Sequence, residues 1–249
     1  MSNDWIGWGS AILFLIFFAV LYRLITSPSK RLEKMLGDGS PLGLRKIPRG
    51  SVEKKKLVDF FSYLFGTHRK HIRLGSLYKA AGQDAYLLTI VTRQKVPEPG
   101  GSSTQYRSMD KYVSMAPTRL TGRFSVNLKP QLNVSGRLAF SLLQQIGVDS
   151  VGTHEGLLEE FGRFFVVFRI GRTEQSQEIP TGLQQVFIRF AQSSQQTWGI
   201  LNFLEGEQGV TFSEGGFVVH LSQTRRPKTL DQLQSILQFG EAIGREVSR

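Results

Sequence analysis

The order of apolar and polar residues divides the chain into three parts, and the first part is a continuous apolar run. Residues 5–22 contain no charged residue, and the apolar character continues past Arg23 to residue 25. A helix needs about 20 apolar residues to cross the hydrocarbon of a bilayer. Residues 12–20 are apolar on every helical face, unlike a core helix with one apolar stripe. We therefore predict a transmembrane anchor over residues 1–25.

A cleaved signal peptide is the main alternative to an anchor, and the flanking residues argue against it. Such a peptide has basic residues before its apolar core and small residues at its cleavage site. Here Asp4 is the only charged residue before the run, and Ser27-Pro28-Ser29 is a poor cleavage site. Aromatic residues at both ends of the run also suit the two membrane interfaces. The run is expected to stay in the mature protein.

Most of the formal net charge of +11 follows directly after the apolar run. Residues 23–73 hold 13 Lys and Arg against 4 Asp and Glu. Because positive flanks stay on the cytoplasmic side, we expect the N-terminus to face out and the following domain to be cytoplasmic. Anionic lipid headgroups are the expected partners of a basic region beside a membrane. They account for the charge, so nucleic-acid binding, which the same charge would favour, is not expected.

A second apolar pattern lies inside this basic region. Between residues 57 and 65, Leu and Phe recur at intervals of three and four, as on one face of a helix. Two interpretations stay open. The helix docks on the core of the following domain, or it lies in the membrane surface with its Phe face down, which its basic ends favour. The residues predicted to contact the membrane surface are Lys54, Lys55, Lys56, Phe60, Phe61, Phe65, Arg69 and Lys70.

The remaining chain reads as one domain behind a linker. Residues 37–51 are rich in Gly and Pro and have no apolar period, which is typical of a linker. We therefore assign residues 26–73 to a basic juxtamembrane linker and amphipathic helix. Residues 74–249 are assigned to the cytoplasm-facing domain.

Strand and helix patterns alternate through residues 74–249. A hairpin is predicted around a turn at residues 82–84, and a long polar loop at residues 96–105. Runs of adjacent strands separated by helices indicate an α+β fold with a mixed, largely antiparallel sheet, packed helices and a C-terminal helix. Strands are predicted at residues 86–92, 111–116, 123–128, 164–170 and within 198–222, and helices at 136–146, from 181 onward and at 230–243.

Few residues could carry chemistry. The chain has no Cys, and it has no phosphate-binding loop, dinucleotide fingerprint or nucleophile elbow. His68 and His71 have the spacing of metal ligands, but their basic neighbours oppose a cation, and His220 is expected on the solvent side of a strand. We predict no catalytic residue, no metal site, no cofactor and no enzymatic activity. Polar residues that we assign to loops and turns are Ser150, His154, Glu155, Glu205, Glu207 and Glu214.

Two motifs between residues 123 and 222 carry a resemblance. Glu159-Glu160-Phe161 with Phe164-Phe165 forms an acidic and aromatic segment that leads into a strand. Pro180-Thr181 with Leu183 forms a helix start ahead of a closing hairpin. In these features the chain resembles an uncharacterised bacterial family of membrane-anchored proteins. The resemblance implies an architecture and no activity, because that family has no assigned reaction.

These patterns together predict a single-pass membrane protein that serves as an accessory, assembly or scaffold protein. Its expected partner is another membrane protein close to the bilayer. One alternative is a membrane-tethered domain that binds a lipid or small ligand in an apolar cavity. A second alternative is an enzyme, which would need polar groups that converge in such a cavity.

Overall fold

The computed structural model covers most of the chain that follows the predicted anchor. The predicted span at residues 5–25 and the predicted helix at residues 136–146 lie outside the described residues. Among those described, no helix is both long enough and apolar enough to cross a membrane. The structure describes residues 28–37, 40–65, 68–98, 101–128, 157–169, 179–198, 209–221, 227 and 229–248.

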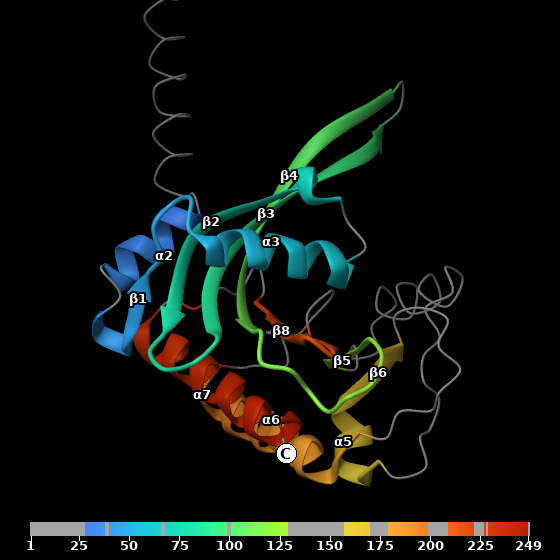
Figure 1. Cartoon of the computed structure of the whole chain (residues 1–249). Helices are drawn as coiled ribbons and strands as arrows, with labels where there is room; N and C mark the ends of the chain where they lie inside the picture. Colours follow the sequence, from blue (N-terminus) through green and yellow to red (C-terminus); the bar gives the residue numbers. More distant parts are fainter. Residues whose placement is uncertain are drawn as a thin grey trace, which may run out of the picture.

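An eight-stranded sheet forms the centre of the fold (Figure 1). Its strand order is β1-β2-β3-β4-β8-β7-β5-β6, and every neighbouring pair is antiparallel. The predicted α+β class with an antiparallel sheet is therefore confirmed. The strands are β1 (Leu44–Lys46), β2 (Ile72–Ala80), β3 (Ala85–Glu98), β4 (Gly101–Ser114), β5 (Phe124–Leu128), β6 (Phe165–Arg169), β7 (Gly209–Ser213) and β8 (Gly216–His220).

Helices cover both faces of the sheet because successive strand residues point to opposite sides. On β3, Tyr86 and Leu88 belong to the core under one helix, whereas Leu87 belongs to the larger core on the other face. Among the described residues, the helix on the first face is α3 (Val52–Phe65). The helices of the larger core are α2 (Pro28–Leu36), α5 (Glu159–Phe164), α6 (Thr181–Trp198) and α7 (Leu230–Val247), and two short 3-10 helices are η1 (Ser40–Leu42) and η2 (Arg69–His71).

The larger core is built around Phe187 of α6. Its ring centroid lies 5.3 Å from that of Phe165 on β6 and 5.4 Å from that of Phe239 on α7. The α7 helix begins where the sequence predicts, since the Gln232 backbone N–H donates to the Thr229 hydroxyl at 3.3 Å. Burial of these rings fixes α6 and α7 against the sheet.

Two predicted irregular segments are regular in the structure. The predicted linker at residues 37–51 contains β1, which pairs with β2, and just before it lies α2, whose Leu32 and Leu36 are buried in the larger core. The predicted boundary at residue 74 therefore falls inside β2, and α2 belongs to the same core as the strands that follow it. The predicted polar loop at residues 96–105 instead forms the end of the β3–β4 hairpin, whose paired register runs out to Glu98 and Gly101.

Candidate functional site

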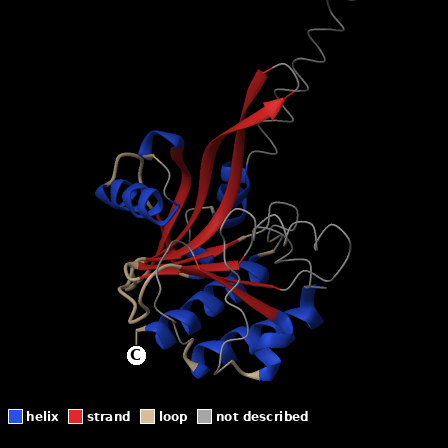
Figure 2. Cartoon of the chain, turned by 90° about the vertical axis from the view of Figure 1, so that its right-hand side faces the viewer, coloured by secondary structure: helices blue, strands red, loops and turns tan. Residues whose placement is uncertain are grey.

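The outer part of the β3–β4 hairpin forms an arm, which we define as residues 93–98 and 101–106. The β2 strand accompanies β3 only as far as the pair of Ile72 and Thr92. On the other side, the described pairing beside β4 extends just past β8, where the Leu221 N–H donates to the Asp110 carbonyl at 3.1 Å. Among the described residues, no strand pairs with the outer edges of the arm. Six strand residues span about 20 Å, and Figure 2 shows the hairpin rising beyond the helices.

The position of α2 shows from which side of the domain the arm projects. The Ser76 hydroxyl of β2 donates to the Glu33 carboxylate at 3.1 Å. Further along both elements, the Tyr78 hydroxyl donates to the Gly37 carbonyl at 3.4 Å. The α2 helix therefore follows the direction of β2, and its first turn lies toward the strand end at the base of the arm. The start of the described chain and the arm lie on the same side (Figure 1).

Several residues predicted to contact the membrane lie on the surface of this region. Arg69 and Lys70 are exposed in η2, which directly precedes β2 at the base of the arm. The Arg69 Nε lies 2.8 Å from the Asp59 Oδ1 of α3, which joins η2 to that helix. The three lysines of α3 are exposed or half-buried, so they also reach solvent: Lys54, Lys55 and Lys56. Their contact with anionic headgroups stays a prediction.

The aromatic side chains of α3 lie elsewhere than the membrane hypothesis requires. Phe61 is 0% exposed and Phe60 is 8% exposed, and both belong to the core between α3 and the sheet. The structure thus corrects the membrane-surface prediction for these two residues, because the sheet already covers their rings. Instead, both side chains pack on the domain, as the other interpretation of the pattern expects. The Phe65 side chain lies outside the described part of the chain.

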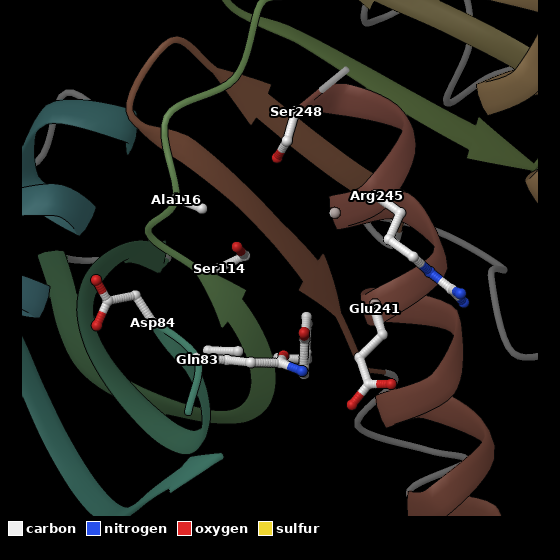
Figure 3. Close-up of a pocket in the computed structure, with 11 residues that line it drawn as sticks. Gln83, Asp84, Ser114, Ala116, Glu241, Arg245 and Ser248 are labelled. Carbon is white, nitrogen blue, oxygen red and sulfur yellow. The ribbon is translucent and has the colours of Figure 1, made fainter. Parts of the chain in front are cut away.

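A cavity of about 470 Å³ lies at the opposite end of β3 and β4 from the arm. One wall is the β2–β3 turn, which contains Gln83 and Asp84, and the other is the last two turns of α7. Figure 3 shows Glu241 and Arg245 projecting from α7, and the Gln83 side chain pointing toward that helix. The Asp84 carboxylate points away and accepts from Lys79 Nζ at 2.9 Å.

The inner part of this cavity contains polar groups from β4. Tyr112 is 2% exposed and Ser114 is 7% exposed. Burial and the charge of Glu241 raise the pKa of Tyr112, so its hydroxyl stays protonated and can donate a hydrogen bond. Tyr112 also explains a glycine in α7, because a Cβ on Gly240 would overlap its ring. The lining of the cavity is mixed, because these polar side chains lie beside apolar wall residues such as Ala85 and Ala116.

A second polar group lies inside the core on the α3 face of the sheet. Lys111 Nζ on β4 lies 2.6 Å from Nδ1 of His220 on β8, and Nε2 of His220 lies 2.7 Å from the Thr211 hydroxyl on β7. An ammonium can only donate, so Nδ1 accepts, and the proton on Nε2 is donated to Thr211. Burial and the positive charge of Lys111 lower the pKa of His220 well below its ordinary value. The predicted solvent-facing position of His220 is therefore wrong.

Of the other candidate residues, those that the structure describes are not brought into a site. The His68 and His71 rings are 6.3 Å apart, and no group of three or more potential metal ligands occurs within the described ranges. Glu214 lies in the exposed turn between β7 and β8. The remaining candidates lie outside the described residues: Ser150, His154, Glu155, Glu205 and Glu207.

The sequence analysis missed both the arm and the cavity. The arm is rich in Gly, Ser and Thr, which is also typical of loops. Tyr112 and Ser114 follow strand alternation, and nothing local relates them to α7, which begins 116 residues after Ser114. Comparison with protein-family models, with curated proteins and with solved structures found no match to this chain. The resemblance to a family of membrane-anchored proteins stays a prediction.

Proposed function

We propose that this protein is a single-pass, membrane-anchored accessory protein. Its cytoplasm-facing domain binds a membrane-protein partner through the β3–β4 arm. The observation that carries the proposal is the projection of the arm from the side of the domain on which α2 begins.

The predicted anchor determines which side of the domain faces the membrane. Only residues 26 and 27 separate the predicted span from α2. If residues 5–25 cross the bilayer, the side of the domain that bears the first turn of α2 faces the membrane. The arm then extends about 20 Å toward the bilayer surface. Arg69 and Lys70 at its base lie where they meet anionic headgroups, each contributing about 1 kcal/mol.

The composition of the arm favours a protein over the lipid interior as its partner. Its second strand is Gly, Ser, Ser, Thr, Gln and Tyr, which has hydrogen-bonding groups but little apolar area to insert. A two-stranded hairpin with no further neighbour is only marginally stable in water, so a partner that packs on it also stabilises it. Lys95 and Pro97 on β3 discourage indiscriminate pairing of the edge, which leaves the arm available for a specific partner.

Site-specific photo-crosslinking in native membranes tests the proposal. A photoreactive residue at Gln94 or Thr104 is expected to crosslink one defined membrane protein. The same residue at the exposed Gln234 of α7 serves as the matched control and is expected not to crosslink that protein. In a second variant, Asn-Gly replaces residues 93–106 and joins Thr92 to Arg107, which are paired across the hairpin. That two-residue turn suits a hairpin, so the domain should stay folded while capture of the partner is lost.

Two results would overturn the proposal. One is crosslinking of the arm to lipid alone, which would make it a membrane-surface element. The other is recovery of the same membrane proteins by the full-length chain and the Asn-Gly variant from mild detergent.

A further inference from the structure

The cavity between the β2–β3 turn and α7 contains buried polar groups for which the described residues provide no partner. Tyr112 and Ser114 are both more than nine-tenths buried and both line the cavity. Among the described residues, neither side-chain hydroxyl has a hydrogen-bond partner. Buried hydroxyls are nearly always hydrogen-bonded, because leaving one unpaired costs about 1–3 kcal/mol. These two hydroxyls therefore indicate that a molecule bound in the cavity forms hydrogen bonds with them.

The Tyr112 ring packs against α7. The ring edge lies against Gly240, where a Cβ would overlap it. The charge of the Glu241 carboxylate also contributes to the raised pKa of the phenol. Tyr112 and Glu241 line the same cavity, so one bound molecule can contact both.

Two opposite charges line the same cavity and do not neutralise each other. Glu241 and Arg245 are one helical turn apart on α7, a spacing at which Cβ atoms are about 5–6 Å apart and ion pairs commonly form. Within the part of the chain that the structure describes, neither side chain forms an ion pair. In Figure 3 both project from the helix beside the cavity. The cavity therefore offers an unpaired guanidinium for an anion and an unpaired carboxylate for a cation.

The size of the cavity and its small wall residues limit what fits. A volume of about 470 Å³ lies within the range of small-molecule sites and is too small for a folded partner. Ala85, Ala116 and Gly244 supply most of the remaining wall, so no large apolar side chain fills the space. A polar molecule that carries both charges satisfies more of this lining than a lipid or a simple ion.

We propose that this cavity binds a small zwitterion, either a free amino acid or a short peptide. The carboxylate of the ligand pairs with Arg245 and its ammonium with Glu241. Tyr112 donates a hydrogen bond to it, and Ser114 or Gln83 completes the polar contacts. This site lies at the other end of β3 and β4 from the arm, and it does not depend on the partner proposed for the arm.

A binding screen with the full-length chain tests the assignment. The probes are the twenty common amino acids and the peptides Gly-Gly and Ala-Ala, with thermal shift first and calorimetry for every hit. A subset of these probes is expected to raise the melting temperature. The matched controls are the N-acetylated form of each hit, which lacks the ammonium, and its amide, which lacks the carboxylate. Both are expected to bind at least tenfold more weakly.

Variants then assign the contacts. Arg245→Gln and Glu241→Gln, both at exposed positions, are each expected to raise Kd at least tenfold. Tyr112→Phe keeps the ring and removes the hydroxyl, with an expected two- to tenfold loss. Arg73→Gln, at the arm end of β2, is the control and should leave Kd unchanged. The proposal fails if no zwitterion binds, if acetylated or amidated probes bind equally well, or if the Arg245 and Glu241 variants bind like the native chain.

Discussion

His220 shows at the scale of one residue how its surroundings fix a protonation state. Its ring lies between Lys111 and Thr211, and each of its two nitrogens has one partner. Protonation would place a second cation beside the Lys111 ammonium and remove the acceptor at Nδ1. Two cations side by side in the core would repel each other and cost several kcal/mol. The imidazole is therefore neutral in the folded domain, and it serves as the acceptor that keeps Lys111 inside.

This arrangement predicts that acid weakens the fold. The pKa of His220 is lowered in the folded state. In the unfolded chain it has its ordinary value of about 6.5, so below that pH the unfolded chain binds a proton that the folded chain does not. Stability is thus complete above that pH and decreases as the pH falls. The expected contribution of His220 is a loss of about 1.4 kcal/mol per pH unit. Urea unfolding of the full-length chain between pH 8 and pH 5 measures it.

Two variants separate His220 from other titrating groups. His220→Asn should be less stable at pH 8 and should show a flatter pH dependence. His68→Asn, on the exposed side of η2, is the control and should keep the native dependence. An unchanged pH profile in the His220 variant would show that another group is responsible.

At the scale of elements, two glycines one turn apart in α7 allow a matched test of how the helix meets the sheet. Alanine is favoured over glycine in a helix by about 1 kcal/mol. At Gly244 a new Cβ would lie 3.9 Å from the Phe217 ring, an ordinary contact, whereas at Gly240 it would overlap the Tyr112 ring. Gly244→Ala should therefore stabilise the domain by about 0.5–1 kcal/mol. Gly240→Ala should destabilise it by about 1–3 kcal/mol through overpacking.

Urea unfolding of both variants at pH 8 measures the pair. If Gly240→Ala were as stable as Gly244→Ala, the close packing of α7 on β4 described above would be incorrect. The comparison is independent of ligand, because both variants are measured without one.

Elements with a strong local pattern could be predicted from the sequence. The hairpin at residues 82–84 has a glycine with φ of +70° in its turn, and the C-terminal helix has its Thr229 cap. The α3 helix was also predictable, but the direction of its Phe face was not. Periodicity identifies an apolar face and not the surface that covers it, so sheet and membrane are equal candidates until the sheet is placed.

The arm and the cavity depend on contacts that no local pattern contains. A segment rich in Gly, Ser and Thr is predicted as a loop from its composition. In the structure, the pairing of β3 with β4 outweighs this local preference. The cavity needs the end of β4, a turn and α7 to meet, and these segments lie far apart along the chain. His220 is buried for the same reason. The side chains of β8 alternate as expected, but α3 packs on the face that was expected to meet solvent.

At the scale of the whole molecule, one pair of strands joins the two proposed sites. The β3 strand has 14 residues and runs from Ala85 at the cavity to Glu98 near the tip of the arm. That is a length of about 45 Å. With the arm directed at the bilayer, the cavity opens on the far side of the domain, toward the compartment from which a small polar ligand would come. This arrangement depends on the orientation of the predicted anchor.

The orientation follows from the distribution of charge around residues 5–25. Only Asp4 precedes the run, and 13 Lys and Arg lie within residues 23–73. Because basic flanks are retained in the cytoplasm, the C-terminal domain is expected on the cytoplasmic face. Carbonate washing should leave the full-length chain in the membrane pellet. In sealed right-side-out vesicles, a C-terminal epitope should resist added protease and become sensitive only after the vesicles are opened.

A change at the N-terminus makes the test quantitative. Lys at positions 2, 3 and 4 reduces the charge difference across the span, so a fraction of the chains should insert with the domain outside. Gln at the same three positions is the matched control and should keep the native orientation. Digestion of the epitope in intact right-side-out vesicles would place the domain on the opposite side. Release of the chain by carbonate would show that residues 5–25 do not anchor it. There would then be no reason to expect the partner of the arm in the membrane.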